Sequence, residues 1–231
     1  MNATKTVDAV VFDMDGVLID SEDIWLEVRE EFAASIGAKW RAEDQVATMG
    51  CNTAAWSRIM VERLDLRARV GMDEDGVARE IIGRMAAKYE QRLPQREGAV
   101  DAVRRAAARW PLGLASGSPR ALGDVVLAVT GLDRVFAATI YGDEVANGKP
   151  APDMYLKVLE RMGVAPARAV GIEDSGNGIR SLAAAGMGIV TAPGPGYPLS
   201  AEVLALAGAC IESMTQLDAG VVERAAAARS R

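Results

Sequence analysis

Two aspartates, Asp13 and Asp15, stand directly after the apolar run 10–12 and before Gly16. The run has the composition of a buried parallel strand, and side chains two apart in an extended chain point the same way. Both carboxylates are therefore expected at the carboxyl end of one strand, where open α/β sheets bind ligands. An aspartate there can attack phosphorus as a nucleophile, and its neighbour can act as general acid and base.

The same Asp-Met-Asp-Gly segment is also typical of a plain turn or of the start of a calcium loop. A calcium loop needs helices on both sides and a glutamate at its twelfth position. Here a strand is expected before the segment, and that position holds Ile24 or Trp25, depending on where the count begins. The calcium loop is disfavoured, but a phosphate-transfer site and a plain turn are equally compatible with this segment alone.

Two further segments carry residues suited to binding phosphate. An apolar run ends at Ser116 and is followed by Gly117, so a hydroxyl and backbone N–H groups could hold a phosphate oxygen at a helix start. Lys149 lies between a glycine and a proline in a chain with five lysines and twenty-one arginines, which favours a need for a compact point charge. Taken singly, a helix-capping serine and a solvated loop lysine are the simpler explanations.

Another strand-like run ends in Glu173 and Asp174 and leads into a glycine-rich turn. Acidic residues at that strand end would repel Asp13 unless a cation lay between them. Mg²⁺ is a hard ion with a preference for oxygen ligands, and it would remove this repulsion. The sequence thus indicates a magnesium site next to the first aspartate.

Taken together, these blocks resemble the haloacid dehalogenase superfamily of phosphohydrolases. The sequence shows D-M-D-G-V, a serine after an apolar strand, G-K-P-A-P-D and G-I-E-D-S in the family's order, across residues 13–174. The opening segment DMDGVLIDSE and the GKPAPD block are similar in particular to the branch with sugar-phosphate phosphatases and β-phosphoglucomutase. The resemblance implies a phosphatase that hydrolyses a small phosphate monoester through an aspartyl-phosphate.

The resemblance also implies a role for each matching residue. Asp13 is the nucleophile, and Asp15 protonates the leaving oxygen and then activates water. Ser116, Gly117 and Lys149 hold the transferring phosphoryl group. Positioning and charge neutralisation are what phosphoryl transfer mainly requires of a protein, so these roles agree with the chemistry.

A Mg²⁺ cofactor is part of the same resemblance. Its implied ligands are Asp13, the main-chain carbonyl of Asp15 and Asp174, with Glu173 in or near the metal shell.

Two parts of the chain differ in their periodicity. From residue 95 onward, strand-like and helix-like segments alternate, as in a parallel sheet with helices on both faces. The expected strands are 111–116, 136–140, 168–173, 187–191 and a weak one at 208–212, and the expected helices are 98–109, 120–130, 153–162, 177–185 and 215–228. Residues 21–92 show helical periodicity without a convincing strand, and Ser21, Thr53 and Asp73 are suitable helix starts.

The helical stretch lies where the family places its cap. We therefore expect an α/β fold with a Rossmann-like parallel sheet core, residues 1–17 and 93–231, and an inserted helical cap domain, residues 18–92. A cap tethered by two linkers can close over a site and exclude water. A helical subdomain with no gating role is the alternative.

Composition excludes several kinds of site and partner. The 231 residues include no histidine, which excludes histidine triads and histidine metal sites, and the net charge of −6 argues against a nucleic-acid partner. Cys51 and Cys210 are far apart without metal-binding spacing, as expected in a reducing compartment. No run approaches a membrane span or a signal core. We expect a cytoplasmic protein acting on a small phosphorylated metabolite; its oligomeric state is open, and a monomer is compatible with the sequence.

The sequence indicates the substrate less closely than it indicates the fold or the catalytic residues. β-Phosphoglucomutases carry a basic cap loop and a histidine ten residues after the second aspartate, whereas this chain has Thr48–Trp56 without arginine and Trp25 at those places. Arg58 follows one turn later. A sugar or polyol phosphate phosphatase is therefore favoured over a mutase, and Trp25 could equally be cap packing. A haloacid dehalogenase and a non-catalytic sensor with the same fold are weaker alternatives.

Overall fold

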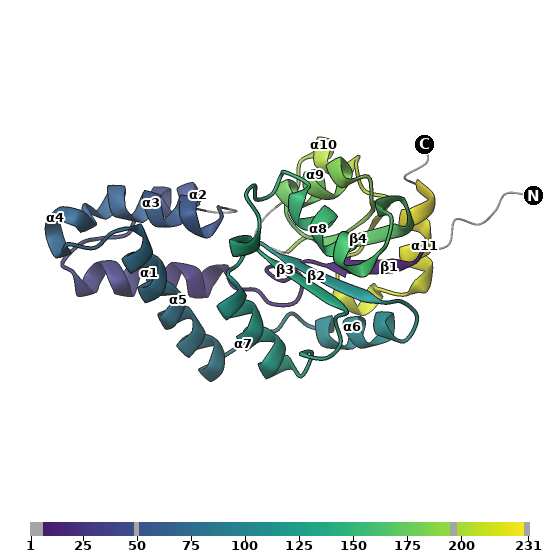
Figure 1. Ribbon diagram of the computed structural model, residues 1–231, viewed down its shortest axis with the longest axis horizontal. Coiled ribbons are helices and arrows are strands. Elements are labelled where there is room, and N and C mark those ends of the chain that lie inside the picture. The colour runs from purple at the N-terminus through teal and green to yellow at the C-terminus, as the bar shows by residue number, and fades with distance from the viewer. Residues whose placement is uncertain (1–6, 49–50, 195–197, 229–231) are drawn as a thin grey trace, which may run out of the picture.

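A computed structural model describes residues 7–48, 51–194 and 198–228 and shows an α/β fold with one six-stranded parallel sheet (Figure 1). The spatial order of the strands is β3-β2-β1-β4-β5-β6. The strands are β1 Ala9–Phe12, β2 Leu112–Ser116, β3 Ala138–Tyr141, β4 Ala169–Glu173, β5 Gly188–Thr191 and β6 Ala209–Cys210. The predicted fold class is confirmed. β1 lies between β2 and β4, so the residues that follow these three strands meet at one edge.

Alternate residues of the central strand pack on opposite faces of the sheet. Val10 and Phe12 belong to one apolar cluster, together with residues of α6, α7 and α11. Ala9 and Val11 belong to the other, with residues of α8 and α9. These helices are α6 Ala99–Ala107, α7 Arg120–Thr130, α8 Asp153–Met162, α9 Gly176–Ala185 and α11 Ala219–Ala228; a short α10, Ala201–Leu204, precedes β6. Burial on both faces explains the near-continuous apolar strands.

A second group of helices lies beyond the carboxyl ends of the strands (Figure 1). It comprises α1 Glu22–Ser35, α2 Ala42–Thr48, α3 Thr53–Leu64, α4 Leu66–Val70 and α5 Glu74–Gln91. α5 packs against α1 and α3 and also reaches α7 beside the sheet. Where the chain leaves and re-enters the sheet region, Ile19 and Gln95 form an antiparallel bridge, so the two connections lie side by side.

Several expected helix details differ from the structure. The segment 215–228 is two elements, a 3₁₀ turn at Met214–Gln216 and then α11, because Asp218 Oδ1 accepts a hydrogen bond from Val221 N at 2.8 Å and starts a new helix. Thr53 does not cap α3, since Asn52 Oδ1 accepts from Ala55 N instead. Asp73 caps α5 as predicted. None of the described helices combines the length and the apolar character that spanning a bilayer requires.

Candidate active site

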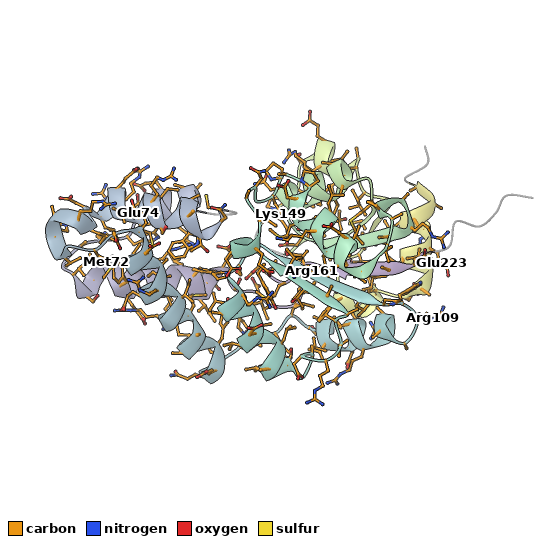
Figure 2. All side chains as sticks on the ribbon, viewed as in Figure 1. Met72, Glu74, Arg109, Lys149, Arg161 and Glu223 are labelled. Carbon is orange, nitrogen blue, oxygen red and sulfur yellow. The ribbon has the colours of Figure 1, made fainter. Side chains whose placement is uncertain are left out.

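Strand ends bring four predicted residues together. Asp13 follows β1, Ser116 ends β2, and Glu173 ends β4 with Asp174 directly after it. The parallel register of these three neighbouring strands places their carboxyl ends at the same edge. Lys149 comes from the loop between β3 and α8, and Figure 2 shows it on the side of the sheet that faces the separate helical group.

Lys149 lies between two buried carboxylates. Its Nζ donates to Asp13 Oδ1 at 2.6 Å and to Glu173 Oε1 at 2.6 Å, and it reaches the main-chain oxygen of Ala115 at 3.3 Å. Burial alone would lower the pKa of Lys149, but the two carboxylates raise it above its ordinary value. The lysine is therefore a fixed positive charge at neutral pH, in contact with the predicted nucleophile.

Glu173 is fully buried and accepts hydrogen bonds on both oxygens. Oε1 accepts from Lys149 and, at 2.8 Å, from the hydroxyl of Tyr155 on α8. Oε2 accepts from the main-chain N–H groups of Asp174 and Ser175 and from the Ser175 hydroxyl. Desolvation would raise the pKa of Glu173, but Lys149 and these donors bring it below its usual value. The contacts of Glu173 make it the residue that holds Lys149 in place.

Asp15 accepts hydrogen bonds from three serine hydroxyls. Ser21 Oγ donates to Oδ1 at 2.7 Å, while Ser118 Oγ and Ser116 Oγ donate to Oδ2 at 2.8 and 3.1 Å. The sequence had identified Ser21 only as a helix start, yet its side chain makes no cap hydrogen bond. Ser118 had no predicted role, although the apolar run of β2 leads into the hydroxyl residues Ser116 and Ser118. Residues 117 and 118 form a bend after β2, and the sequence pattern did not indicate that this bend directs the Ser118 hydroxyl to Asp15.

The acidic cluster has the composition of a site for a divalent cation. Carboxylate oxygens of Asp13, Glu173 and Asp174 all lie within 4.8 Å of one another. Burial first, and then the neighbouring carboxylates, raise the pKa of Asp13 well above its usual value and that of Asp174 to about 8. Such crowding indicates a missing positive charge.

The surroundings of Asp174 also suit a divalent cation. Within the described part of the chain, its side chain makes no hydrogen bond or ion pair with protein, so its oxygens are available as ligands. Gly16, at φ 81°, leaves room for it: a Cβ at that position would lie 1.9 Å from Asp174 Oδ2. Any side chain at residue 16 would displace this carboxylate. The residues present therefore suit Mg²⁺, with Asp13 and Asp174 as the side-chain ligands best placed to bind it.

A cavity of about 770 Å³ opens from this cluster toward the helical group. Asp13, Asp15, Gly117, Lys149 and Asp174 line its inner end. Ser116 and Glu173 are fully buried and contact residues that line it.

The outer end of the cavity is formed by the helical group. Trp25 and Trp56 line it, and their rings meet edge to face with centroids 5.9 Å apart. Arg29, which sequence reasoning missed, lies 4.7 Å from the centre of the Trp25 ring and lines the same cavity. Of the predicted cap loop, Met49 and Gly50 lie outside the described residues, while Cys51 and Asn52 line the cavity. Arg58 is exposed and lines a different cavity.

The fold, the strand-end carboxylates and the lysine between them define a class of enzyme. The chain belongs to the haloacid dehalogenase-like hydrolases, whose family pattern matches residues 7–186. It is therefore a hydrolase, as the sequence predicted.

Relatives with more specific names cover most of the chain. A phosphorylated carbohydrates phosphatase from Thermotoga maritima is 30% identical, over 78% of this chain and 82% of that protein. Fructose-1-phosphate phosphatase YqaB from Escherichia coli (strain K12) is 33% identical, over 78% of this chain and 94% of that protein. The crystal structure of CbbY from Rhodobacter sphaeroides has the same fold, with a TM-score of 0.78 and 24% identity over 94% of this chain and 99% of that one.

Proposed function

We propose that this hydrolase is a Mg²⁺-dependent phosphatase that removes phosphate from a small sugar or polyol phosphate through an aspartyl-phosphate on Asp13. The observation that carries the proposal is the buried contact of Lys149 with Asp13 at 2.6 Å, beside the acidic cluster at the cavity's inner end. The names of the two phosphatase relatives support the sugar-phosphate class. Among hydrolases of this family, that contact favours chemistry on a negatively charged group.

In the first step, a carboxylate oxygen of Asp13 attacks phosphorus and the bond to the leaving oxygen breaks. Lys149 neutralises charge on the transferring phosphoryl group, and Ser116 and the main chain at Gly117 supply hydrogen-bond donors. Ser116 must turn its hydroxyl away from Asp15 to do so, because it donates there at 3.1 Å. Mg²⁺ bound by Asp13, Asp174 and the Asp15 carbonyl would neutralise phosphate charge; Glu173 remains a candidate ligand, although its oxygens already accept five hydrogen bonds.

Asp15 serves both steps. As an acid it gives a proton to the leaving oxygen, and as the resulting carboxylate it takes a proton from the water that attacks phosphorus. The products are an alcohol and inorganic phosphate, and Asp13 is regenerated. The hydroxyls of Ser21 and Ser118 fix the orientation of the carboxylate for both transfers.

Residues 18–92 are proposed as a cap domain, with residues 1–17 and 93–231 as the core. All described helices of the first segment lie outside the sheet layers, and the bridge between Ile19 and Gln95 joins its two connections (Figure 1). Closure of such a cap would exclude water and bring Trp25 and Trp56 over the substrate. A cytoplasmic location fits the unpaired cysteines Cys51 and Cys210.

The test measures phosphate release with Mg²⁺ from a panel of sugar and polyol monophosphates and from p-nitrophenyl phosphate. Release from the panel that disappears in excess chelator is expected. Full activity in chelator, or chloride release from a 2-haloacid, would contradict the proposal in favour of a dehalogenase. β-Glucose 1-phosphate with a trace of glucose 1,6-bisphosphate is the control for a mutase: glucose 6-phosphate formed faster than free phosphate would overturn the phosphatase assignment.

A further inference from the structure

Arg29 is a buried cation that takes no part in the phosphoryl transfer proposed for this site. It lies on α1, one turn after Trp25, and only 4% of its surface is exposed. Its guanidinium packs 4.7 Å from the centre of the Trp25 ring and 5.8 Å from that of Trp56, and it lines the cavity that contains Asp13. Burial lowers the pKa of Arg29 to about 10, so the side chain still carries its charge at neutral pH.

No ion pair with a described residue neutralises this charge, although the carboxylate of Glu22 acts on it through space and raises the pKa of Arg29 against the larger effect of burial. Within the described residues, no carboxylate oxygen comes within 4.0 Å of the Arg29 guanidinium. Nη1 donates to Gln45 Oε1 at 3.0 Å, whereas Nε is buried and has no hydrogen-bond partner. Nη2 has none either in this part of the chain. Because buried charges are normally paired, an unpaired guanidinium facing a cavity points to an anionic ligand.

The other cations that line this cavity either contact hydrogen-bond acceptors or are exposed to solvent. Lys149 contacts two carboxylates, and Arg96 donates to three main-chain carbonyls, those of Gly16, Ala192 and Pro193. Arg180 is exposed to solvent. Among the described cations that line the cavity, Arg29 is thus the one that is buried and has neither an ion pair nor a full set of hydrogen-bond acceptors.

We propose that Arg29 binds a carboxylate at the end of the substrate remote from the transferring phosphoryl group, so that among sugar-derived phosphate monoesters those that carry an acid group are preferred over the matching polyol phosphates. This inference rests on the proposed function. The Nε–Nη2 edge of a guanidinium presents two parallel N–H donors, which match the two oxygens of a carboxylate. Neither donor of Arg29 has a partner in the described residues, and since Nε is buried, a carboxylate must displace neighbouring side chains to reach both.

A carboxylate suits this end of the cavity better than a second phosphate. Asp20, Glu22 and Asp23, before and at the start of α1, also line the cavity and add negative charge to it. One guanidinium balances the single charge of a carboxylate but not the nearly double charge of a phosphate. Glu22 does not replace the ligand, because its carboxylate accepts a hydrogen bond from Gln45 and none from Arg29. Burial and then Asp15 raise the pKa of Glu22, and the opposing effect of Arg29 is smaller.

The experiment compares kcat/KM for matched acids and alcohols: 3-phosphoglycerate with glycerol 3-phosphate, erythronate 4-phosphate with erythritol 4-phosphate, and gluconate 6-phosphate with glucitol 6-phosphate. The unmodified protein should prefer the acid by about tenfold or more in the pair whose length fits. Arg29→Gln should lower kcat/KM for that acid by about 10- to 100-fold, mainly through KM, and change the alcohol by less than about threefold.

Two variants serve as controls. Arg29→Lys keeps the charge without the two-donor edge and should fall between the parent and Arg29→Gln. Arg58→Gln changes an exposed arginine of α3 that lines the other cavity, so the preference for acids should stay as in the parent. Thermal melts of all variants show whether each remains folded.

Three results would overturn the inference. One is that the unmodified protein prefers the alcohol, or shows no preference, in every pair. This measurement does not depend on any variant being folded. Another is an equal loss on acids and alcohols in Arg29→Gln, which would mean a packing role. A third is a selective loss on fructose 1,6-bisphosphate relative to fructose 1-phosphate with no loss on acids, which would assign a second phosphate instead.

Failure of the phosphatase proposal has a different signature. In that case no compound, including p-nitrophenyl phosphate, releases phosphate. Titration of the unmodified protein followed by tryptophan fluorescence then still tests Arg29, because Trp25 and Trp56 lie at the site. Tighter binding of gluconate 6-phosphate than of glucitol 6-phosphate supports the inference, and equal binding overturns it.

Discussion

At the inner end of the cavity, Asp13, Asp15 and Lys149 are held by strand ends and by hydrogen bonds to one another and to buried neighbours. At the outer end, Trp25 and Arg29 are held by packing between helices, with ring contacts and a single hydrogen bond to Gln45. The inner arrangement tolerates little change, because each group is oriented by several partners. Side chains at the outer end can be replaced without disturbing the sheet. This end is therefore suited to selecting among substrates.

Asp13→Asn should produce the largest effect and tests whether the chemistry takes place at the inner end of the cavity. Asparagine is close in shape but is not a nucleophile, so turnover should fall by at least about a thousandfold. The change also removes a negative charge from the crowded acidic cluster, so the melting temperature should hold or rise. Phosphate release and a thermal melt measure both; residual activity within about tenfold of the parent would contradict the nucleophile assignment.

Removal of the metal should come next in size. A chelator should abolish phosphate release, and Asp174→Ala should raise the Mg²⁺ concentration needed or abolish the response to Mg²⁺. The physical reason is that the Asp174 carboxylate lies next to Asp13 and has no hydrogen-bond or ion-pair partner among the residues that the structure describes. A Mg²⁺ titration of activity measures this effect, and an unchanged half-saturating concentration in Asp174→Ala would show that the ion binds elsewhere.

Asp15→Asn should affect substrates unequally. Loss of the acid should slow alkyl phosphates, which have poor leaving groups, by about 10²- to 10⁴-fold, and slow formation of the aspartyl-phosphate from p-nitrophenyl phosphate far less. Single-turnover release of each leaving group measures this step. Equal slowing of both kinds of ester would mean that Asp15 only orients other groups.

The metal-free protein should lose stability as pH rises. The folded pKa of Asp174, about 8, lies above its ordinary 3.8, so between these values the folded state binds more protons than the unfolded state. The free energy of unfolding then falls with rising pH across that window, and Asp13 acts in the same direction. The chain has no histidine to obscure the effect. In chelator the melting temperature should be lower at pH 8 than at pH 5, and Asp174→Asn should reduce the difference; a higher value at pH 8 would contradict this.

Ser118→Ala should have the smallest effect. Asp15 keeps Ser21 as a hydroxyl donor when Ser116 turns to the phosphoryl group, so kcat should fall by a factor of about 2 to 10. Ser35→Ala is a suitable control, since Ser35 donates to the main chain at the end of α1. A loss as large as that of Asp15→Asn would mean that Ser21 alone cannot hold Asp15 in position.

The sequence predicts the inner end well because strand ends leave local marks. Each of Asp13, Ser116 and Glu173 follows or ends an apolar run, and the parallel sheet then fixes which runs are neighbours. Asp73 was likewise predicted to start α5. These features depend on residues close together in the chain.

The outer end could not be predicted in the same way. The meeting of Arg29 with Trp56 depends on how α1 packs beside α3, which periodicity does not determine. The cap loop drew attention to Arg58, although among the described residues of the helical group the arginine that lines the cavity with Asp13 is Arg29 on α1. Ser21 was interpreted by its helix-start position, but its hydroxyl is used by Asp15 across a turn.

The most direct test of the account is a rapid-quench experiment on Asp15→Asn with p-nitrophenyl phosphate and Mg²⁺. If Asp13 carries the phosphoryl group and Asp15 activates water, p-nitrophenol should appear in a burst of one equivalent per protein. The protein should then gain the mass of one phosphoryl group, mapped to the peptide that contains Asp13. Steady release of p-nitrophenol with no phosphoryl group on the protein, or with the group on another residue, would contradict the account.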